Sequence, residues 1–139
     1  GLWRTYDRLR MLEDELFGRF DLTSQQYNVL RLLQAHDPGT LRTLDLAARL
    51  VSRAPDITRM LDRLEERGWI ERHRPSDNRR VVVVRISAAG RRLLDAIHGS
   101  LRECHARQLG HLSRGELKQL SHLLQAARKP HEVDGSHWR

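Results

Sequence analysis

With 139 residues, the chain is long enough for one domain with its own core, and because aromatic residues make up only 5% we expect that core to be mainly leucine. A formal net charge of +7 favours a polyanionic partner, although an ordinary solvated basic surface would also account for it. The chain has no run of about 18 apolar residues, which excludes a membrane span. Its single cysteine excludes an intramolecular disulfide. Because it also lacks a signal-peptide pattern, we expect a cytoplasmic protein.

The N-terminal stretch predicts an amphipathic helix over residues 2–20. Its apolar side chains recur at intervals of three and four, the spacing of one helix face. The stripe consists of Leu2, Tyr6, Leu9, Leu12, Leu16 and Phe20, and Trp3 and Phe17 widen it. Because so much apolar surface must be covered, we expect this helix to dock on another element.

A second helix is predicted to begin after Thr23 and to run to about His36. Thr23 and Gln26 have the spacing of a capping box, and the Asp-Pro-Gly sequence at residues 37–39 ends the helix. Residues 41–43 are expected to form a brief β segment that pairs beside the hairpin described below.

The next stretch predicts a helix-turn-helix. A short helix with the apolar residues Leu46, Ala47 and Leu50 precedes a tight turn at residues 51–54. The second helix is expected to start near residue 54 and end at residue 67, because Pro55 suits a first helical turn and Gly68 suits the position after a helix end. Its apolar face consists of Ile57, Met60, Leu61 and Leu64. Such a unit presents the exposed N-terminal half of its second helix to the DNA major groove.

Two β-forming runs follow the second helix, at residues 69–74 and 80–86. Residues 75–78, Pro-Ser-Asp-Asn, have the composition of a turn. A basic hairpin directly after a candidate recognition helix predicts a winged helix-turn-helix, whose tip could contact a DNA backbone or a minor groove.

The C-terminal part predicts two more helices and a short polar tail. One begins at Ser87 and continues to about Leu112, and the other begins at a capping box formed by Ser113 and Glu116 and is stopped by Pro130. Their apolar stripes are Leu94, Ile97, Leu101 and Cys104 in the first, and Leu117, Leu120, Leu123, Leu124 and Ala127 in the second.

The predicted helix over residues 87–112 is roughly 35–40 Å long, which is longer than a small domain is wide. A compact monomer could not cover its apolar stripe, so we expect the terminal helices to pack together and against a second copy. A two-fold dimer would place two recognition helices on two half-sites about 34 Å apart, as in a pseudo-palindromic operator.

The polar face of the recognition helix and the turn before it carry the residues that we expect to contact bases and phosphates. These are Arg53, Pro55, Asp56, Thr58, Arg59 and Arg63. An ordinary exposed helix face is the alternative, because the pairs Asp56–Arg59, Arg59–Asp62 and Arg63–Glu66 could satisfy one another at a spacing of three. The adjacent hairpin favours DNA contact.

The predicted wing tip contains Asp77, Arg79 and Arg80. An arginine suits the negative potential of a narrow minor groove, and an adjacent aspartate can hold its guanidinium in one orientation. A solvated hairpin turn is the alternative interpretation.

Three sequence motifs carry a resemblance to a known family. They are TR-x-L-x-RLE-x-RGW-I-x-R at residues 58–72, D-x-RR at residues 77–80 and I-S-x-x-G at residues 86–90. From about Leu9 to Leu124 the chain resembles the multiple-antibiotic-resistance-regulator (MarR) family of bacterial transcription factors. Members usually have Thr where Ser87 stands, and often an acidic residue where Asn78 stands, which leaves open which arginine Asp77 orients.

The resemblance implies a homodimeric, mainly α winged helix-turn-helix protein with a small β-hairpin wing, which dimerises through its N- and C-terminal helices. It also implies a repressor released from double-stranded DNA by a small aromatic or phenolic ligand, bound where the dimerisation helices meet the winged domain. There, Tyr6, Arg10, Phe17, Tyr27 and Arg31 could bind an aromatic carboxylate. Core packing for Phe17 and Tyr27 and solvation for the two arginines are the alternatives.

No pattern predicts a cofactor, a metal or a catalytic site. The eight histidines form no HxH pair, and no nucleophile elbow or phosphate loop is present. Cys104 continues an apolar stripe and is expected to be a buried hydrophobe.

We therefore predict a winged helix-turn-helix unit at residues 21–86, dimerisation helices at residues 1–20 and 87–129, and a tail at residues 130–139. The predicted function is a DNA-binding transcriptional regulator that associates with the nucleoid and not with membranes. A winged-helix protein-interaction module and a nonspecific chromosome-binding protein remain the alternatives.

Overall fold

The computed structural model describes residues 1–50 and 56–132. Within these ranges the chain forms six α-helices, one 3-10 turn and three short strands. The helices are α1 (Leu2–Arg19), α2 (Ser24–Ala35), α3 (Thr43–Arg49), α4 (Ile57–Glu66), α5 (Ala88–Leu109) and α6 (Arg114–Arg128), and the 3-10 turn is Lys129–His131. No helix in the described part of the chain is long and apolar enough to cross a membrane.

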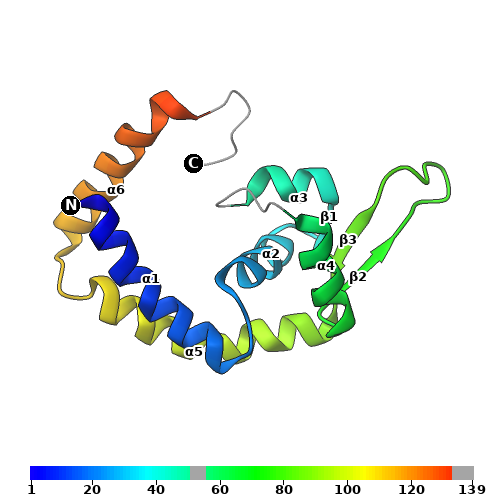
Figure 1. Ribbon diagram of the computed structural model, residues 1–139, viewed down its shortest axis with the longest axis horizontal. Helices are drawn as coiled ribbons and strands as arrows, with labels where there is room; N and C mark the ends of the chain where they lie inside the picture. The colour runs from blue at the N-terminus through cyan, green and yellow to red at the C-terminus, as the bar shows by residue number, and fades with distance from the viewer. Residues whose placement is uncertain (51–55, 133–139) are drawn as a thin grey trace.

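The three strands form one antiparallel sheet in the order β1-β3-β2. They are β1 (Thr40–Arg42), β2 (Ile70–His73) and β3 (Val83–Ile86). Leu41 lies opposite Val84, and Ile70 lies opposite Ile86. The brief β segment predicted beside the hairpin is therefore confirmed, and the hairpin of β2 and β3 projects from the helices as a wing (Figure 1).

One hydrophobic core holds α2, α3, α4 and the sheet together. The face of α4 predicted from its periodicity points into this core, with Leu61 and Leu64 almost fully buried. Leu46 anchors α3 to the same core, whereas Ala47, which we had placed on the apolar face of this helix, is exposed. This core fixes the helix-turn-helix to the wing, and the mainly α winged fold predicted from the sequence is confirmed.

A second core joins α1 to α5. Its buried members are Leu16, Phe17, Leu22, Ile97 and Cys104. Gln108 strengthens the contact, because its Nε2 donates to the carbonyl oxygen of Leu9 and to Oε1 of Glu13. The prediction that the N-terminal helix docks on another element is confirmed, although Trp3, which we had counted in its stripe, is 83% exposed.

Three predicted helix starts are confirmed at atomic detail. Thr23 and Gln26 form a reciprocal capping box at α2, as do Ser113 and Glu116 at α6. Ser87 caps α5 by accepting a hydrogen bond from the Gly90 amide. These caps satisfy backbone N–H groups that have no partner inside their helices.

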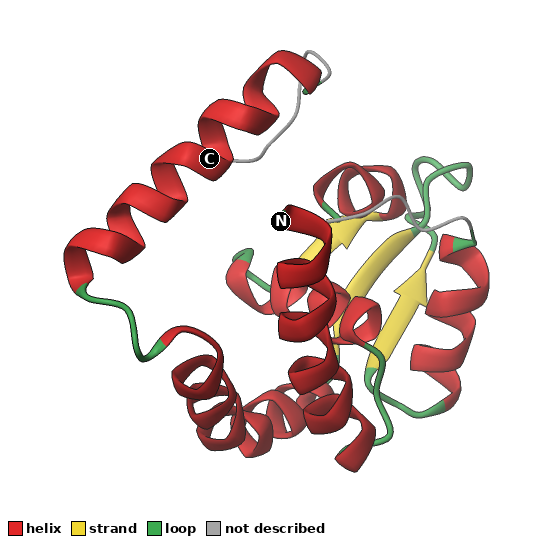
Figure 2. Cartoon of the chain, turned by 60° about the vertical axis from the view of Figure 1, so that its left-hand side comes forward, coloured by secondary structure: helices red, strands yellow, loops and turns green. Residues whose placement is uncertain are grey.

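Helix α6 stands apart from the rest of the protomer in both views (Figures 1 and 2). None of its residues is buried, and Leu117, Leu123 and Leu124 of its predicted apolar stripe are exposed. The helix ends at Arg128, and Pro130 lies in the 3-10 turn that follows. Residues 133–139 of the predicted tail lie outside the described residues.

The recognition helix starts later than its sequence suggested. Helix α4 begins at Ile57, and Asp56 is its N-cap instead of a residue of its first turn. A carboxylate side chain competes well for the first free N–H groups of a helix, so Asp56 starts the helix that we had begun near residue 54. The turn at residues 51–54 and the predicted contacts Arg53 and Pro55 lie outside the described residues.

Two other boundaries also differ. Strand β3 begins at Val83, because Arg80 and the two valines after it do not join the ladder. Helix α5 ends at Leu109, three residues before the predicted end, because Gly110 closes it.

Candidate nucleic-acid interface

The exposed face of α4 carries three of the predicted DNA contacts. Thr58, Arg59 and Arg63 are all exposed, and the Arg59 side chain is 73% exposed. Asp56 Oδ1 accepts a hydrogen bond from the Arg59 amide at 3.0 Å, and its Oδ2 lies 3.4 Å from Arg59 Nε. Asp56 therefore caps the helix and also faces the guanidinium of Arg59.

The wing tip is held by backbone contacts. Arg74 Nη1 donates to the Arg79 carbonyl at 2.7 Å, and the Arg80 amide donates to Asn78 Oδ1 at 3.2 Å. In residues 56–132, no ion pair joins Asp77 to Arg79 or Arg80, so the expected orientation of an arginine by this aspartate is not seen. Both arginine side chains are exposed, as a contact to DNA requires.

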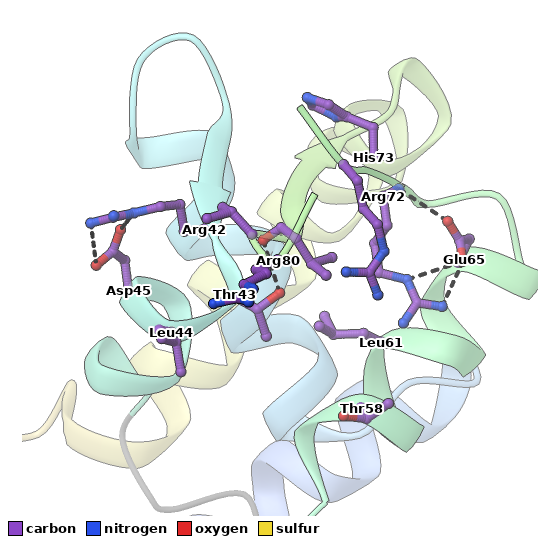
Figure 3. Close-up of a pocket in the computed structure, with 13 residues that line it drawn as sticks. Arg42, Thr43, Leu44, Asp45, Thr58, Leu61, Glu65, Arg72, His73 and Arg80 are labelled. Carbon is purple, nitrogen blue, oxygen red and sulfur yellow. Dashed lines mark hydrogen bonds and ion pairs between the residues drawn. The ribbon is translucent and has the colours of Figure 1, made fainter. Parts of the chain in front are cut away.

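An open groove of about 820 Å³ lies between α3, α4 and the stem of the wing (Figure 3). Its walls carry more arginine than carboxylate, which makes it a suitable surface for a polyanion. Thr43 joins two of its walls, because its amide and hydroxyl both donate to the Val82 carbonyl. The charged lining residues are Arg42, Asp45, Glu65, Arg72, Arg74 and Arg80.

Arg72 ties the wing to the recognition helix, a role that our sequence analysis missed. Its Nη2 lies 2.6 Å from Glu65 Oε2, and its amide donates to Glu65 Oε1 at 3.0 Å (Figure 3). The same Nη2 lies 2.6 Å from Asp62 Oδ1. The side-chain hydrogen bond from Arg72 lowers the pKa of Glu65 below its usual value. The same hydrogen bond raises the pKa of the Arg72 guanidinium. Asp62, whose pairing with Arg59 belonged to the alternative interpretation of this helix face, is therefore paired across to β2.

The five predicted ligand contacts do not converge on one site. Tyr27 and Arg31 line a hollow of about 250 Å³ between α2 and α5, together with Leu94, Ile97 and His98. Arg31 is positioned there by Asn28, whose Oδ1 accepts a hydrogen bond from Arg31 Nη2 at 2.9 Å.

The other three predicted ligand contacts lie elsewhere. Phe17 is 2% exposed and stacks on Tyr27, with ring centroids 4.7 Å apart, which is the core packing that we had weighed as the alternative. Tyr6 is exposed on α1, and Arg10 lies 3.3 Å from Asp14 on the same helix. Neither of these two residues lines the hollow between α2 and α5.

The cysteine and the histidines give no sign of a reactive centre. Cys104 is buried, and this burial raises the pKa of its thiol above the usual value, which disfavours the reactive thiolate. Within the described residues, no three His, Cys, Asp or Glu side chains come close enough together to hold a metal ion.

Comparison with known proteins places this chain among transcription regulators. The model of the MarR family matches residues 22–82. A crystal structure of a MarR transcription factor from Planctomyces limnophilus is 49% identical, covers 90% of each chain and has a TM-score of 0.72.

Two curated relatives are similar over shorter stretches. The HTH-type transcriptional regulator FarR of Neisseria gonorrhoeae is 31% identical over 97 residues, which are 70% of this chain and 65% of FarR. The homoprotocatechuate degradative operon repressor of Escherichia coli is 28% identical over 107 residues, which are 77% of this chain and 71% of that repressor. The chain thus spans just under two thirds of the length of FarR.

Proposed function

Because the chain belongs to the MarR family of transcriptional regulators, we propose that it is a sequence-specific DNA-binding repressor. The observation that carries this proposal is the common surface formed by the exposed face of α4, the basic groove and the wing. In this arrangement α4 enters the major groove and the wing tip lies along the neighbouring backbone or minor groove. The name of the Escherichia coli operon repressor supports the sign of regulation.

We propose that the repressor is a homodimer. The exposed apolar side chains of α1 and α6 support this, because Leu2, Trp3 and Tyr6 at one end of the chain and Leu123 and Leu124 at the other have no cover in the protomer. Residues 1–20 and 87–129 would then form the dimer, and residues 21–86 would bind DNA. A pseudo-palindromic operator follows from the two-fold symmetry.

We also propose that a small aromatic carboxylate releases the repressor from DNA by binding between α2 and α5. The hollow there combines an aromatic ring, apolar side chains and the Arg31 guanidinium, a set that suits both halves of such a ligand. The relative named for an operon that degrades homoprotocatechuate, itself an aromatic acid, supports this ligand class. A ligand that fits only one arrangement of the recognition helices must shift the population toward it.

The DNA-binding function is tested by measuring fluorescence anisotropy with DNA from the chain's own promoter region and with random DNA of equal length. A sequence-specific regulator prefers the promoter DNA, and its affinity falls steeply as salt rises because bound phosphates release counterions. A nonspecific chromosome-binding protein binds both DNAs equally, and a protein-interaction module binds neither.

The effector function is tested by titrating a panel of aromatic acids with and without the preferred DNA. Thermodynamic linkage requires that a releasing compound bind more weakly in the presence of DNA, by the same factor by which it weakens DNA binding. Arg31→Gln should abolish the effect of the compound while leaving DNA affinity unchanged. Equal ligand affinity with and without DNA would rule out this mechanism.

A further inference from the structure

The end of the recognition helix lies where the two hydrophobic cores meet. Helix α4 ends at Glu66, and Trp69, three residues later, packs against both the core of the winged unit and the core between α1 and α5. Leu93 of α5 is the other partly buried side chain shared by both cores. Trp69 and Leu93 therefore mark a point at which the two cores are in contact.

Arg67 connects this point to the end of α1. Its guanidinium carbon lies 3.8 Å from the centre of the Trp69 ring, a cation–π contact. The same guanidinium donates through Nη1 to the Asp21 carbonyl, and its Nη1 lies 3.3 Å from Asp21 Oδ2. Asp21 follows directly on α1 and has a φ of +55°, so the carbonyl that Arg67 contacts belongs to the turn that leaves α1.

Helix α5 holds the same segment from its other side. The hydroxyl of Ser87 donates to the Gly68 carbonyl at 2.6 Å, and its amide donates to the Trp69 carbonyl at 3.0 Å. Gly90 packs so closely that a Cβ there would lie 2.3 Å from the Trp69 carbonyl oxygen. The end of α4 is thus tied to α5 and to the turn that follows α1, and it lies where α5 begins (Figure 1).

We propose that Arg67, stacked on Trp69 and bonded to Asp21, is a positioning residue that sets the half-site spacing accepted by the dimer. It acts by fixing the direction of α4 relative to the helices that carry the dimer axis, and it does not itself contact DNA. This inference rests on the proposed function, because half-site spacing has a meaning only for a dimer that binds an operator. Arg67 was not among the DNA contacts expected from the sequence.

The test compares two operators with each variant. Operator DNA is first selected by the wild-type protein from a random oligonucleotide pool, and a second operator carries one extra base pair between the half-sites. The wild type should strongly prefer the selected spacing. Arg67→Gln should reduce this preference by roughly five- to tenfold, the effect expected for losing one hydrogen bond of typical net strength. Affinity for DNA with a single half-site should not change.

Asp21→Asn separates positioning from charge. Asparagine tolerates the positive φ at this position, and the substitution raises the net charge by one, whereas Arg67→Gln lowers it by one. A purely electrostatic influence would strengthen DNA binding in one variant and weaken it in the other. Positioning predicts that both variants lose spacing preference, and that Asp21→Asn loses less of it because asparagine keeps the backbone carbonyl that Arg67 contacts. Arg102→Gln, an equal charge change on an exposed part of α5, should retain it.

Each outcome distinguishes the two proposals. If the wild type does not prefer any selected DNA over random DNA, both the proposed function and this inference fail. If the wild type does discriminate, but both variants retain the wild-type spacing preference, only the positioning role of Arg67 is overturned. Thermal unfolding of each variant at one protein concentration shows that the comparison is made on folded protein.

Discussion

Asp56 has two roles at the start of α4, the proposed recognition helix. The Asp56 carboxylate accepts the Arg59 amide and so starts α4, and it also lies close to the Arg59 guanidinium. Both side chains are more than half exposed, and ion pairs of this kind add little to stability. The ion pair thus leaves the Arg59 guanidinium accessible, as its proposed contact with DNA requires.

Arg59→Ala is expected to weaken binding to the selected operator by about 1–3 kcal/mol, because an arginine that reads a base edge contributes about that much. The free energy of unfolding should change by less than about 0.5 kcal/mol, since the lost ion pair is on the surface. Anisotropy titrations with operator and random DNA measure the first effect, and urea unfolding measures the second. Unaltered operator affinity would show that the face of α4 is not the reading surface.

Gly90 is a residue whose importance comes from packing alone. We expect Gly90→Ala to destabilise the protein by about 1–3 kcal/mol, because the added methyl group would overlap the Trp69 carbonyl oxygen and push α5 away from the sheet. Gly99→Ala is the matched control on the same helix. A Cβ at residue 99 meets nothing within 4 Å, so alanine should stabilise α5 by about 0.5–1 kcal/mol. Urea unfolding at one protein concentration measures both, and equal effects would contradict the close contact.

At the scale of elements, the wing and the recognition helix act as one unit. Arg72 of β2 binds two carboxylates of α4, and Thr43 at the start of α3 binds the carbonyl of Val82 in the stem of the wing. Arg72 also offsets one of the two negative charges of Asp62 and Glu65, the second of which lines the groove. The elements proposed to face DNA are therefore joined by contacts among themselves, and α4 is tied to α1 and α5, two of the proposed dimerisation helices, mainly at its end.

Glu65→Gln should reveal this clamp through its pH dependence. Glu65 has a lowered pKa in the folded protein, so its contact with Arg72 adds stability above the pKa of a glutamate in the unfolded chain, about 4.3. This stability is lost as the pH falls through the still lower pKa of the folded state. At pH 7 the variant should be less stable by about 1 kcal/mol, allowing for partial exposure of the pair.

The measurement is urea unfolding of wild type and variant at pH 7 and at decreasing pH below the pKa of an unfolded glutamate, about 4.3. The difference between the two proteins should shrink as the pH falls. Glu66→Gln, at the exposed neighbouring position, serves as the control and should show a much smaller difference at pH 7. A difference for Glu65→Gln that does not depend on pH would contradict the ionic nature of the clamp.

At the scale of the whole molecule, α1 and α6 differ in burial, and we therefore expect α1 to be needed for folding and α6 only for the proposed dimer. Helix α1 contributes Leu16 and Phe17 to a core, so deleting residues 1–20 should expose the apolar side of α5 and cause aggregation or loss of DNA binding. Helix α6 contributes no buried residue to its own protomer. Substitutions on its apolar stripe should therefore affect the dimer and leave the protomer folded.

Leu123→Asp is expected to convert the dimer to a folded monomer, because a carboxylate in an apolar interface loses its hydration without gaining a partner. Operator affinity should fall sharply, since the two half-sites are no longer bound together. Gln125→Asp introduces the same charge on an exposed position of α6 and is the control. Light scattering after size-exclusion chromatography gives the mass, and far-UV circular dichroism shows that the helices persist. A Leu123→Asp protein that remains dimeric would place the interface elsewhere.

Local order follows from the sequence by itself, because it depends on residues that are near one another in the chain. The capping boxes at Thr23 and Ser113, the glycine after the end of α4 and the existence of the wing strands all follow from short-range patterns, although β3 begins three residues later than predicted. The winged helix-turn-helix also follows, because its order of elements and its motif residues lie within one continuous stretch. The assignments of base, phosphate and ligand contacts stay predictions.

Tertiary structure alone decided which charged and aromatic residues meet across elements. Several acidic residues lie near Arg72 in the sequence, and only the docking of β2 on α4 makes Asp62 and Glu65 its ion-pair partners. Likewise, 46 residues separate Asp21 from Arg67, and no local pattern brings them together. For the same reason, the five residues predicted to bind a ligand do not all line one hollow of the protomer. The burial of Phe17 and the exposure of Tyr6 depend on how α1 is rotated against α5, and an amphipathic period does not determine that rotation.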